Sequence, residues 1–135
     1  MLKKIAPHEI IAHDWSLASA DPEGMAAHFY ARLFEMAPET AAMFGGTDMK
    51  AQGGKLATAL GIVVRHAADV DRIAQPLADL GRKHMGWGVR RDQYDTVGAA
   101  LIATLQDRLG ADFDDAHVTA WVSLYGSVVA LMHAE

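Results

Sequence analysis

Three polar side chains, His84, Gln52 and Tyr30, stand in rows of otherwise apolar residues at helical spacing. Each of these side chains can bind a metal ion or a ligand when it lines a buried site. An imidazole can bind a metal ion, while an amide and a phenol can donate hydrogen bonds to a ligand. Their function therefore depends on whether they face the interior of the protein or the solvent.

The stretch LGRKHMGWGV places His84 near the end of a predicted helix. Residues three and four positions apart share a helix face, so His84 lies on the same face as Leu80 and Gly81. Arg82 and Lys83 fall on other faces and can reach water. We therefore expect His84 to point inward. We also expect Gly81, which has no side chain, to leave room for a planar group beside the helix.

Each of the three residues also has an explanation that needs no ligand. A basic residue at the C-terminal end of a helix meets the negative end of its dipole, and Gly86 or Gly88 would then be an ordinary helix cap. Gln52 could lie in solvent, in a frayed first turn of its helix. Tyr30 could be a core tyrosine whose hydroxyl is bonded to the backbone.

The elements that must position these residues are predicted from apolar periodicity and from proline and aspartate signals. All four prolines stand where a helix could begin, and β-branched residues are few. Asp21, Asp92 and either Thr47 or Asp48 are candidate N-caps. The predicted helices cover residues 22–36, 38–44, 48–66, 73–84, 92–109 and 114–134. The chain is therefore expected to be all-α, with about six or seven helices and an antiparallel C-terminal pair.

Composition narrows the class of protein. The 135 residues suggest one domain, 1–135, and the net charge of −5 argues against binding to nucleic acid or to an anionic membrane. There are no cysteines, so a disulfide framework and a thiolate metal site are excluded. No stretch has the length of a signal peptide core or of a membrane span, which needs about 20 apolar residues. We expect a soluble, cytoplasmic protein.

Three stretches together carry a family resemblance: FYARLFEMAPETAAMF, LGRKHMGWGV followed by QYDTVGAALIATL, and AWVSLYG. They resemble bacterial globins of the flavohaemoglobin lineage, including the single-domain type without a reductase. The resemblance extends from about Trp15 to Met132. It implies a globin fold around one haem b, iron protoporphyrin IX, which lies between a long distal helix and the short helix that carries the proximal histidine.

The resemblance assigns functions to residues position by position. His84 matches the proximal iron ligand, and Tyr30 and Gln52 match the polar residues of the distal pocket. The remaining residues that it implies as haem contacts are Phe44, Leu56, Leu80, Val89, Tyr94 and Val97. Two departures from the family pattern occur. The stretch from Phe44 to Gln52 is shorter, and the proximal glutamate of the family would fall one residue after Glu135, the nearest candidate.

The resemblance implies that ferrous iron binds O2, and also NO and CO, for oxygen binding or NO detoxification. An enzymatic alternative is an NO dioxygenase that relies on a separate reductase. A third possibility is a haem-free, globin-like protein that acts through protein contacts. We expect a monomer or a weak homodimer.

Overall fold

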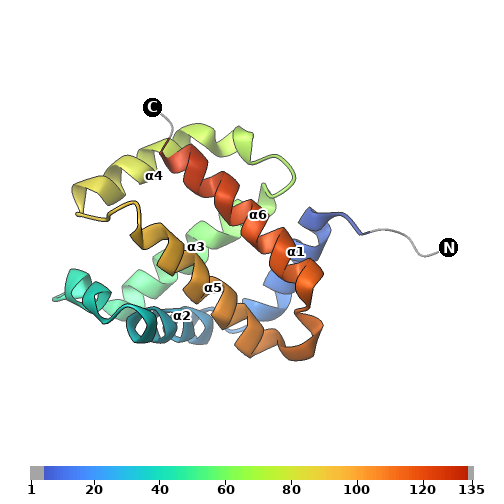
Figure 1. The fold of residues 1–135 in the computed structure, drawn as a ribbon, viewed down its shortest axis with the longest axis horizontal. Helices are drawn as coiled ribbons and strands as arrows, with labels where there is room; N and C mark the ends of the chain where they lie inside the picture. The colour runs from blue at the N-terminus through green and yellow to red at the C-terminus, as the bar shows by residue number, and fades with distance from the viewer. Residues whose placement is uncertain (1–4, 134–135) are drawn as a thin grey trace.

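The computed structural model describes residues 5–133, and these residues form helices joined by short connections, with no strand among them (Figure 1). The α-helices are α1 (Pro7–Ala18), α2 (Pro22–Met36), α3 (Met49–Arg65), α4 (Ala74–Gly86), α5 (Gln93–Leu109) and α6 (Asp115–Met132). Three short 3-10 segments are η1 (Pro38–Phe44), η2 (Val70–Ile73) and η3 (Gly110–Asp112). The all-α prediction is confirmed. Within the described residues, no helix is long and apolar enough to cross a membrane.

The helix starts follow the capping signals with one exception. The carboxylates of Asp21, Asp48 and Asp114 each accept a hydrogen bond from a backbone N–H two or three residues ahead, at 3.1 Å. They satisfy amide groups that a helix leaves unpaired in its first turn. The expectation for Asp92 is wrong, because its side chain makes no capping bond and instead accepts from Arg90 Nε at 3.1 Å.

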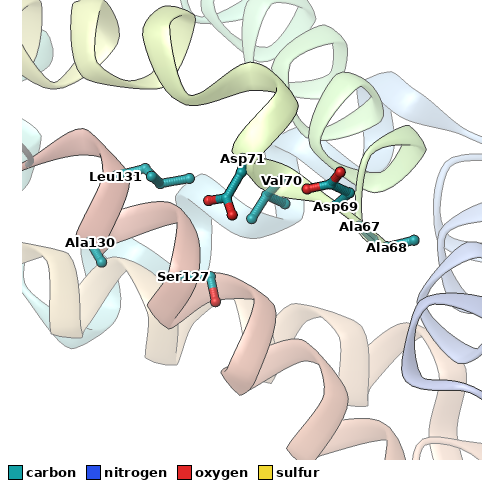
Figure 2. A pocket seen from close by; sticks show the side chains of 8 residues that line it. All are labelled: Ala67, Ala68, Asp69, Val70, Asp71, Ser127, Ala130 and Leu131. Atoms are coloured by element: carbon teal, nitrogen blue, oxygen red, sulfur yellow. The ribbon is translucent and has the colours of Figure 1, made fainter.

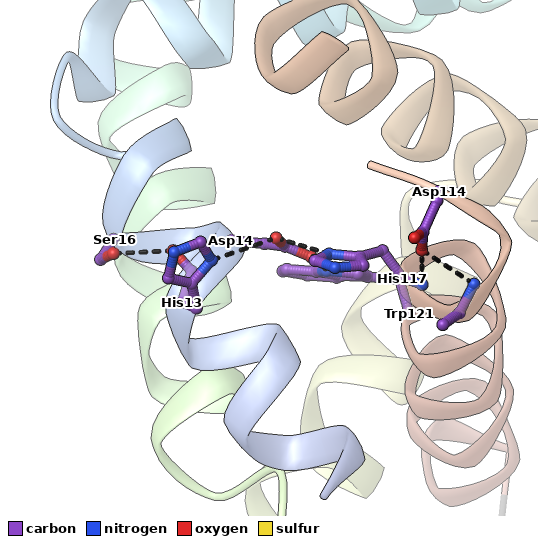
Figure 3. Close-up of polar contacts among 7 residues, drawn as sticks. His13, Asp14, Ser16, Asp114, His117 and Trp121 are labelled. Atoms are coloured by element: carbon purple, nitrogen blue, oxygen red, sulfur yellow. Dashed lines mark hydrogen bonds and ion pairs between the residues drawn. The ribbon is translucent and has the colours of Figure 1, made fainter. Parts of the chain in front are cut away.

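A buried carboxylate joins the first and last helices. Asp14 of α1 is 2% exposed, and it accepts hydrogen bonds from two side chains of α6 (Figure 3). Trp121 Nε1 donates at 2.9 Å and His117 Nδ1 at 2.7 Å. Because an unpaired buried carboxylate is costly, these bonds hold α1 against α6 at a defined point.

The main core lies where α2 crosses α3 and α5, and α1 and α6 close it. α5 and α6 pack against each other and run in opposite directions, as predicted for the C-terminal pair (Figure 1). α2 and α3 approach closely at Gly53, where an added Cβ would lie 3.0 Å from the Cβ of Ala26. Glycine at position 53 therefore favours the close approach of the two helices, although a glycine lowers helix propensity.

The helix that carries His84 is attached mainly on one side. Among the described residues, the closest packing of α4 is against α6 and η2, and Tyr94 of α5 belongs to the same small core as Leu77 of α4. The closest approach is at Gly81, where an added Cβ would lie 1.8 Å from the carbonyl oxygen of Met132. The expectation that Gly81 leaves room for a planar group is wrong, because the backbone of α6 already occupies that space.

Candidate functional site

The direction of the His84 ring is set by a hydrogen bond within α4. His84 Nδ1 donates to the carbonyl oxygen of Leu80 at 2.8 Å, one turn earlier in the helix, and the side chain is partly buried. In a neutral imidazole this bond places the proton on Nδ1 and leaves the lone pair on Nε2. Metal-binding histidines are commonly oriented in this way by a bond from the other ring nitrogen.

The chain turns back under His84 immediately after α4. The N–H of Gly88 donates to the carbonyl of Met85, and the N–H of Val89 donates to the carbonyl of His84, both at 3.0 Å. Gly88 has a φ of 84°, the left-handed conformation that favours glycine at a helix C-terminus. Gly88 therefore caps the C-terminal end of α4, as in the explanation of this stretch that needs no ligand. The same turn returns Val89 toward His84, so the two explanations are compatible.

Tyr94, at the start of α5, lies beside His84, with 6.2 Å between the ring centroids. Tyr94 is buried, and its hydroxyl has no hydrogen-bond partner among the described residues. Burial raises the pKa of this hydroxyl. Tyr125 Oη donates to the carbonyl oxygen of Tyr94 at 2.5 Å, and the His133 ring meets the Tyr94 ring edge-on at 4.7 Å. Leu80 and Val89 complete this group, which we call the His84 cluster.

Tyr30 and Gln52 meet across the contact between α2 and α3. Gln52 Nε2 donates to Tyr30 Oη at 3.3 Å, so Gln52 is not left in solvent by a frayed first turn. Tyr30 is 7% exposed, and burial raises the pKa of its hydroxyl although the bond from Gln52 lowers it. The Phe44 ring meets the Tyr30 ring edge-on, with 5.3 Å between the centroids. We call these three residues the Tyr30 cluster.

The two clusters lie in different parts of the core. Leu56 and Val97 are partly buried and pack against the main core, which also contains Tyr30 and the partly buried Phe44. Leu80, Val89 and Tyr94 belong to the smaller core near the end of α6. Val63 and Val128 pack against both cores. The structure therefore divides the expected site residues into two groups that face different elements and are joined by apolar contacts.

Two surface hollows lie away from both clusters. One, of about 430 Å³, lies between the connection after α3 and the C-terminal half of α6, and Asp69, Asp71 and Ser127 line it (Figure 2). The other, of about 570 Å³, is on the outer face of α3 beside Lys55 and Ile62. Neither is lined by His84, Gln52 or Tyr30, so the candidate site is identified by its side-chain chemistry.

The residues around His84 fit a haem better than a metal ion held by side chains alone. Within residues 5–133, no three His, Asp or Glu side chains converge on a point where they could hold a metal ion. A metal at His84 would therefore need its other ligands from a cofactor. The side chains near His84 are mainly apolar, and the buried Tyr94 hydroxyl lacks a partner, which is consistent with a large apolar group in this region.

Sequence reasoning missed several residues beside these clusters. The exposed Trp87 lies with its ring centroid 5.1 Å from that of His84, and the contacts of Tyr125 and His133 with Tyr94 were not foreseen. Tyr125 had a signal only as one residue of the stretch AWVSLYG, which carries part of the resemblance. The glutamate candidate, Glu135, lies outside the described residues.

Sequence comparisons find related proteins over most of the chain. Residues 27–132 match the globin family. A protein named flavohemoprotein from Bordetella pertussis is 30% identical over 82% of this chain, and one from Chromobacterium violaceum is 33% identical over 76%. The matches cover 28% and 26% of those relatives, so the chain spans little more than a quarter of their length.

Structure comparison gives the same fold. A Pseudomonas aeruginosa protein, described as structurally homologous to human haemoglobin, has a TM-score of 0.83 at 23% identity and covers 94% of this chain and 95% of its own. A Campylobacter jejuni globin has a TM-score of 0.80 at 23% identity and covers 93% and 91%. The predicted globin fold is confirmed. With its helices in this arrangement and residues 27–132 matched, the chain belongs to the globin family, and membership implies that it binds haem.

Proposed function

We propose that residues 1–135 form a single domain that binds haem b through His84 Nε2 and reversibly binds a diatomic gas. The observation that carries this proposal is the bond from His84 Nδ1 to the Leu80 carbonyl at 2.8 Å. In the neutral ring it keeps the proton on Nδ1 and leaves the Nε2 lone pair free to bind iron. Family membership supports haem as the cofactor.

When bound, haem supplies an iron with one open position for O2, NO or CO, and the protein around that position decides between storage and reaction. Apolar side chains have the task of excluding water from the cofactor. Leu80 and Val89 would do so on the His84 side, and Phe44, Leu56 and Val97 elsewhere around it. All five are partly buried and pack against one of the two cores.

Tyr30 would hold the gas ligand by donating its hydroxyl proton. Gln52 Nε2 donates to Tyr30 Oη, so the oxygen already acts as an acceptor and the phenolic O–H is left to donate. Burial raises the pKa of Tyr30, so the hydroxyl stays protonated at neutral pH. In this proposal Tyr30 is the direct donor, and Gln52 orients it and adds a second amide proton near the ligand.

NO dioxygenation is the second candidate function. In that reaction one NO, one O2 and one electron give one nitrate ion. The Tyr30–Gln52 pair favours it because strong donors slow the loss of O2, and the relatives are named flavohemoproteins, a name that joins a flavin with a haem. In this proposal the electron comes from a flavoprotein reductase.

Replacement of His84 tests the assignment, and His66 provides a matched control. His66 Nδ1 also donates to the carbonyl four residues earlier, at 2.9 Å, at the end of α3. We expect His84→Ala to be purified without stoichiometric haem unless imidazole is added, and His66→Ala to keep its haem and its Soret band. Full haem retention in His84→Ala with an unchanged ferrous spectrum would contradict the proposal.

Two further measurements separate the remaining alternatives. A wild-type protein without a Soret band would favour a haem-free interaction protein. If haem is bound, the yield of nitrate per electron supplied, measured with O2 and NO present, separates NO dioxygenation from reversible gas binding.

A further inference from the structure

A short basic segment with an exposed apolar centre begins in the last turns of α4 and continues into the connection to α5. Residues 82–91 contain four of the 12 Lys and Arg residues of a chain whose net charge is −5. No Asp or Glu occurs in the segment, although Asp79 and Asp92 flank it. We call residues 82–91 the basic corner. Its charge is opposite to that of the chain as a whole.

Two of its four cations are left uncompensated. Arg82 forms an ion pair with Asp79, and Arg90 Nε lies 3.1 Å from an Asp92 carboxylate oxygen. Lys83 and Arg91 are exposed, and neither has an ion-pair partner within residues 5–133. The basic corner therefore presents positive charge to the solvent.

The basic corner also exposes two large apolar side chains. Met85 is 64% exposed and Trp87 is 63% exposed, more than any other large apolar side chain described. Protein interfaces typically combine an apolar centre with a charged rim, and Trp, Met and Arg are enriched in them. An exposed apolar pair with charges on both sides in sequence is a typical feature of a docking surface.

The basic corner includes the proposed iron ligand, His84. The Trp87 ring centroid is 5.1 Å from that of His84, and the Trp87 N–H donates to the carbonyls of Lys83 and His84 at 3.0 and 3.1 Å. The hydrogen bonds of the turn at Gly88 hold this arrangement. A partner seated on Trp87 would therefore be close to His84.

We propose that the basic corner is the docking surface for an acidic flavoprotein that supplies single electrons to this protein. The inference rests on the proposed function, because it requires a haem iron that is oxidised and must be reduced. One electron leaves the reduced flavin and converts ferric iron to ferrous, and no covalent bond forms or breaks. Since the rest of the chain is acidic, it repels such a partner and orients it toward residues 82–91.

The test uses the haem-loaded protein and a flavodoxin, a small acidic flavoprotein, as the probe. The variant K83E/R91E reverses the two uncompensated charges. The variant K55E/R65E is the matched control, since Lys55 and Arg65 are exposed on α3 and also lack an ion-pair partner among the described residues. Both variants change the net charge equally. The first readout is the dissociation constant of the complex with oxidised flavodoxin, and the second is the rate of haem reduction by reduced flavodoxin.

We expect K83E/R91E to weaken binding and slow reduction by at least about tenfold at low salt, and the difference to shrink toward wild type as salt screens the charges. K55E/R65E should change both by much less. Trp87→Ala should weaken binding several-fold with little dependence on salt, because it removes an apolar contact. Complete reduction by excess dithionite should give the same final ferrous spectrum in all variants.

Three results would overturn the proposal. Equal effects of the two charge reversals would mean that only net charge matters. Unchanged binding in K83E/R91E would mean that the partner docks elsewhere. Loss of haem from K83E/R91E would assign Lys83 and Arg91 to the haem carboxylates. Gas binding by wild type, read from its optical spectra, tests the proposed function separately, so failure of docking alone leaves that function standing.

Discussion

The hydroxyl of Tyr30 provides the sharpest test of the proposed gas site. In Tyr30→Phe the ring keeps its edge-on contacts with Phe29 and Phe44, at centroid distances of 5.1 and 5.3 Å, so no cavity is created. The substitution removes the hydroxyl, and with it two hydrogen bonds. One is the bond that Tyr30 Oη accepts from Gln52 Nε2, and the other is the bond that the hydroxyl would donate to a gas ligand.

The expected size of the effect follows from the bond that is lost. The bond from Gln52 is long, at 3.3 Å, so its loss should change the stability of the fold little. A hydrogen bond to a ligand that carries partial charge contributes about 1.5–3 kcal/mol. Since each 1.4 kcal/mol is about a tenfold change, O2 should dissociate roughly 10- to 100-fold faster from Tyr30→Phe.

Stopped-flow measurement of O2 and CO dissociation separates this effect from a general loosening of the site. Bound CO carries less charge on its outer atom, so its dissociation should change far less than that of O2. Gln52→Leu should show the same selectivity more weakly, because it removes the residue that orients Tyr30. Equal changes for O2 and CO in Tyr30→Phe, or no change for either, would show that Tyr30 is only a core tyrosine.

Two further predictions concern stability. Gly81→Ala should lower the free energy of unfolding by about 1–3 kcal/mol. The new Cβ would lie 1.8 Å from the Met132 carbonyl oxygen, so α4 would have to shift away from α6. Asp107→Asn should be destabilising at neutral pH, because bonds from Arg32 and His28 lower the pKa of Asp107 from 3.8 to about 2. Stability from a lowered pKa is present above 3.8 and is lost as the pH falls to about 2, so the difference from wild type should shrink over that range.

Each of these predictions has a control. Gly54→Ala adds the same methyl group to a helix where no atom lies within 4 Å of the new Cβ, so it should leave the fold unchanged or stabilise it by up to about 1 kcal/mol. Asp112→Asn removes an exposed carboxylate that has no ion pair among the described residues. Chemical denaturation measures both sets. A harmless Gly81→Ala, or a pH-independent effect of Asp107→Asn, would contradict the reasoning.

The helical fold could be predicted from the sequence because its signals are local. A proline at the first position of a helix, an aspartate before it and an apolar residue every three or four positions act within one or two turns. Pro7, Pro22 and Pro38 each begin an element, and Asp48 caps α3 as expected. Asp92 failed as a cap because its carboxylate pairs with Arg90, a competition that the capping pattern does not reveal.

Within the candidate site, the expectation that His84 shares a helix face with Leu80 was also based on a local property. Helix periodicity placed it with Leu80, and the structure adds that its Nδ1 is bonded to the carbonyl of that residue. The globin resemblance pointed to Tyr30 and Gln52. Their hydrogen bond joins two helices across 22 residues of sequence, and no local pattern contains it.

The sequence by itself determined where helices begin, which faces are apolar and which family the chain resembles. Only the tertiary structure decided which surfaces meet. It placed the Met132 backbone against Gly81, and it brought Trp121 to Asp14 across 107 positions of the chain. The physical reason is the distance in sequence over which each interaction acts. Caps and helix faces depend on neighbours within about four residues, whereas contacts between helices depend on how all the apolar faces are buried together.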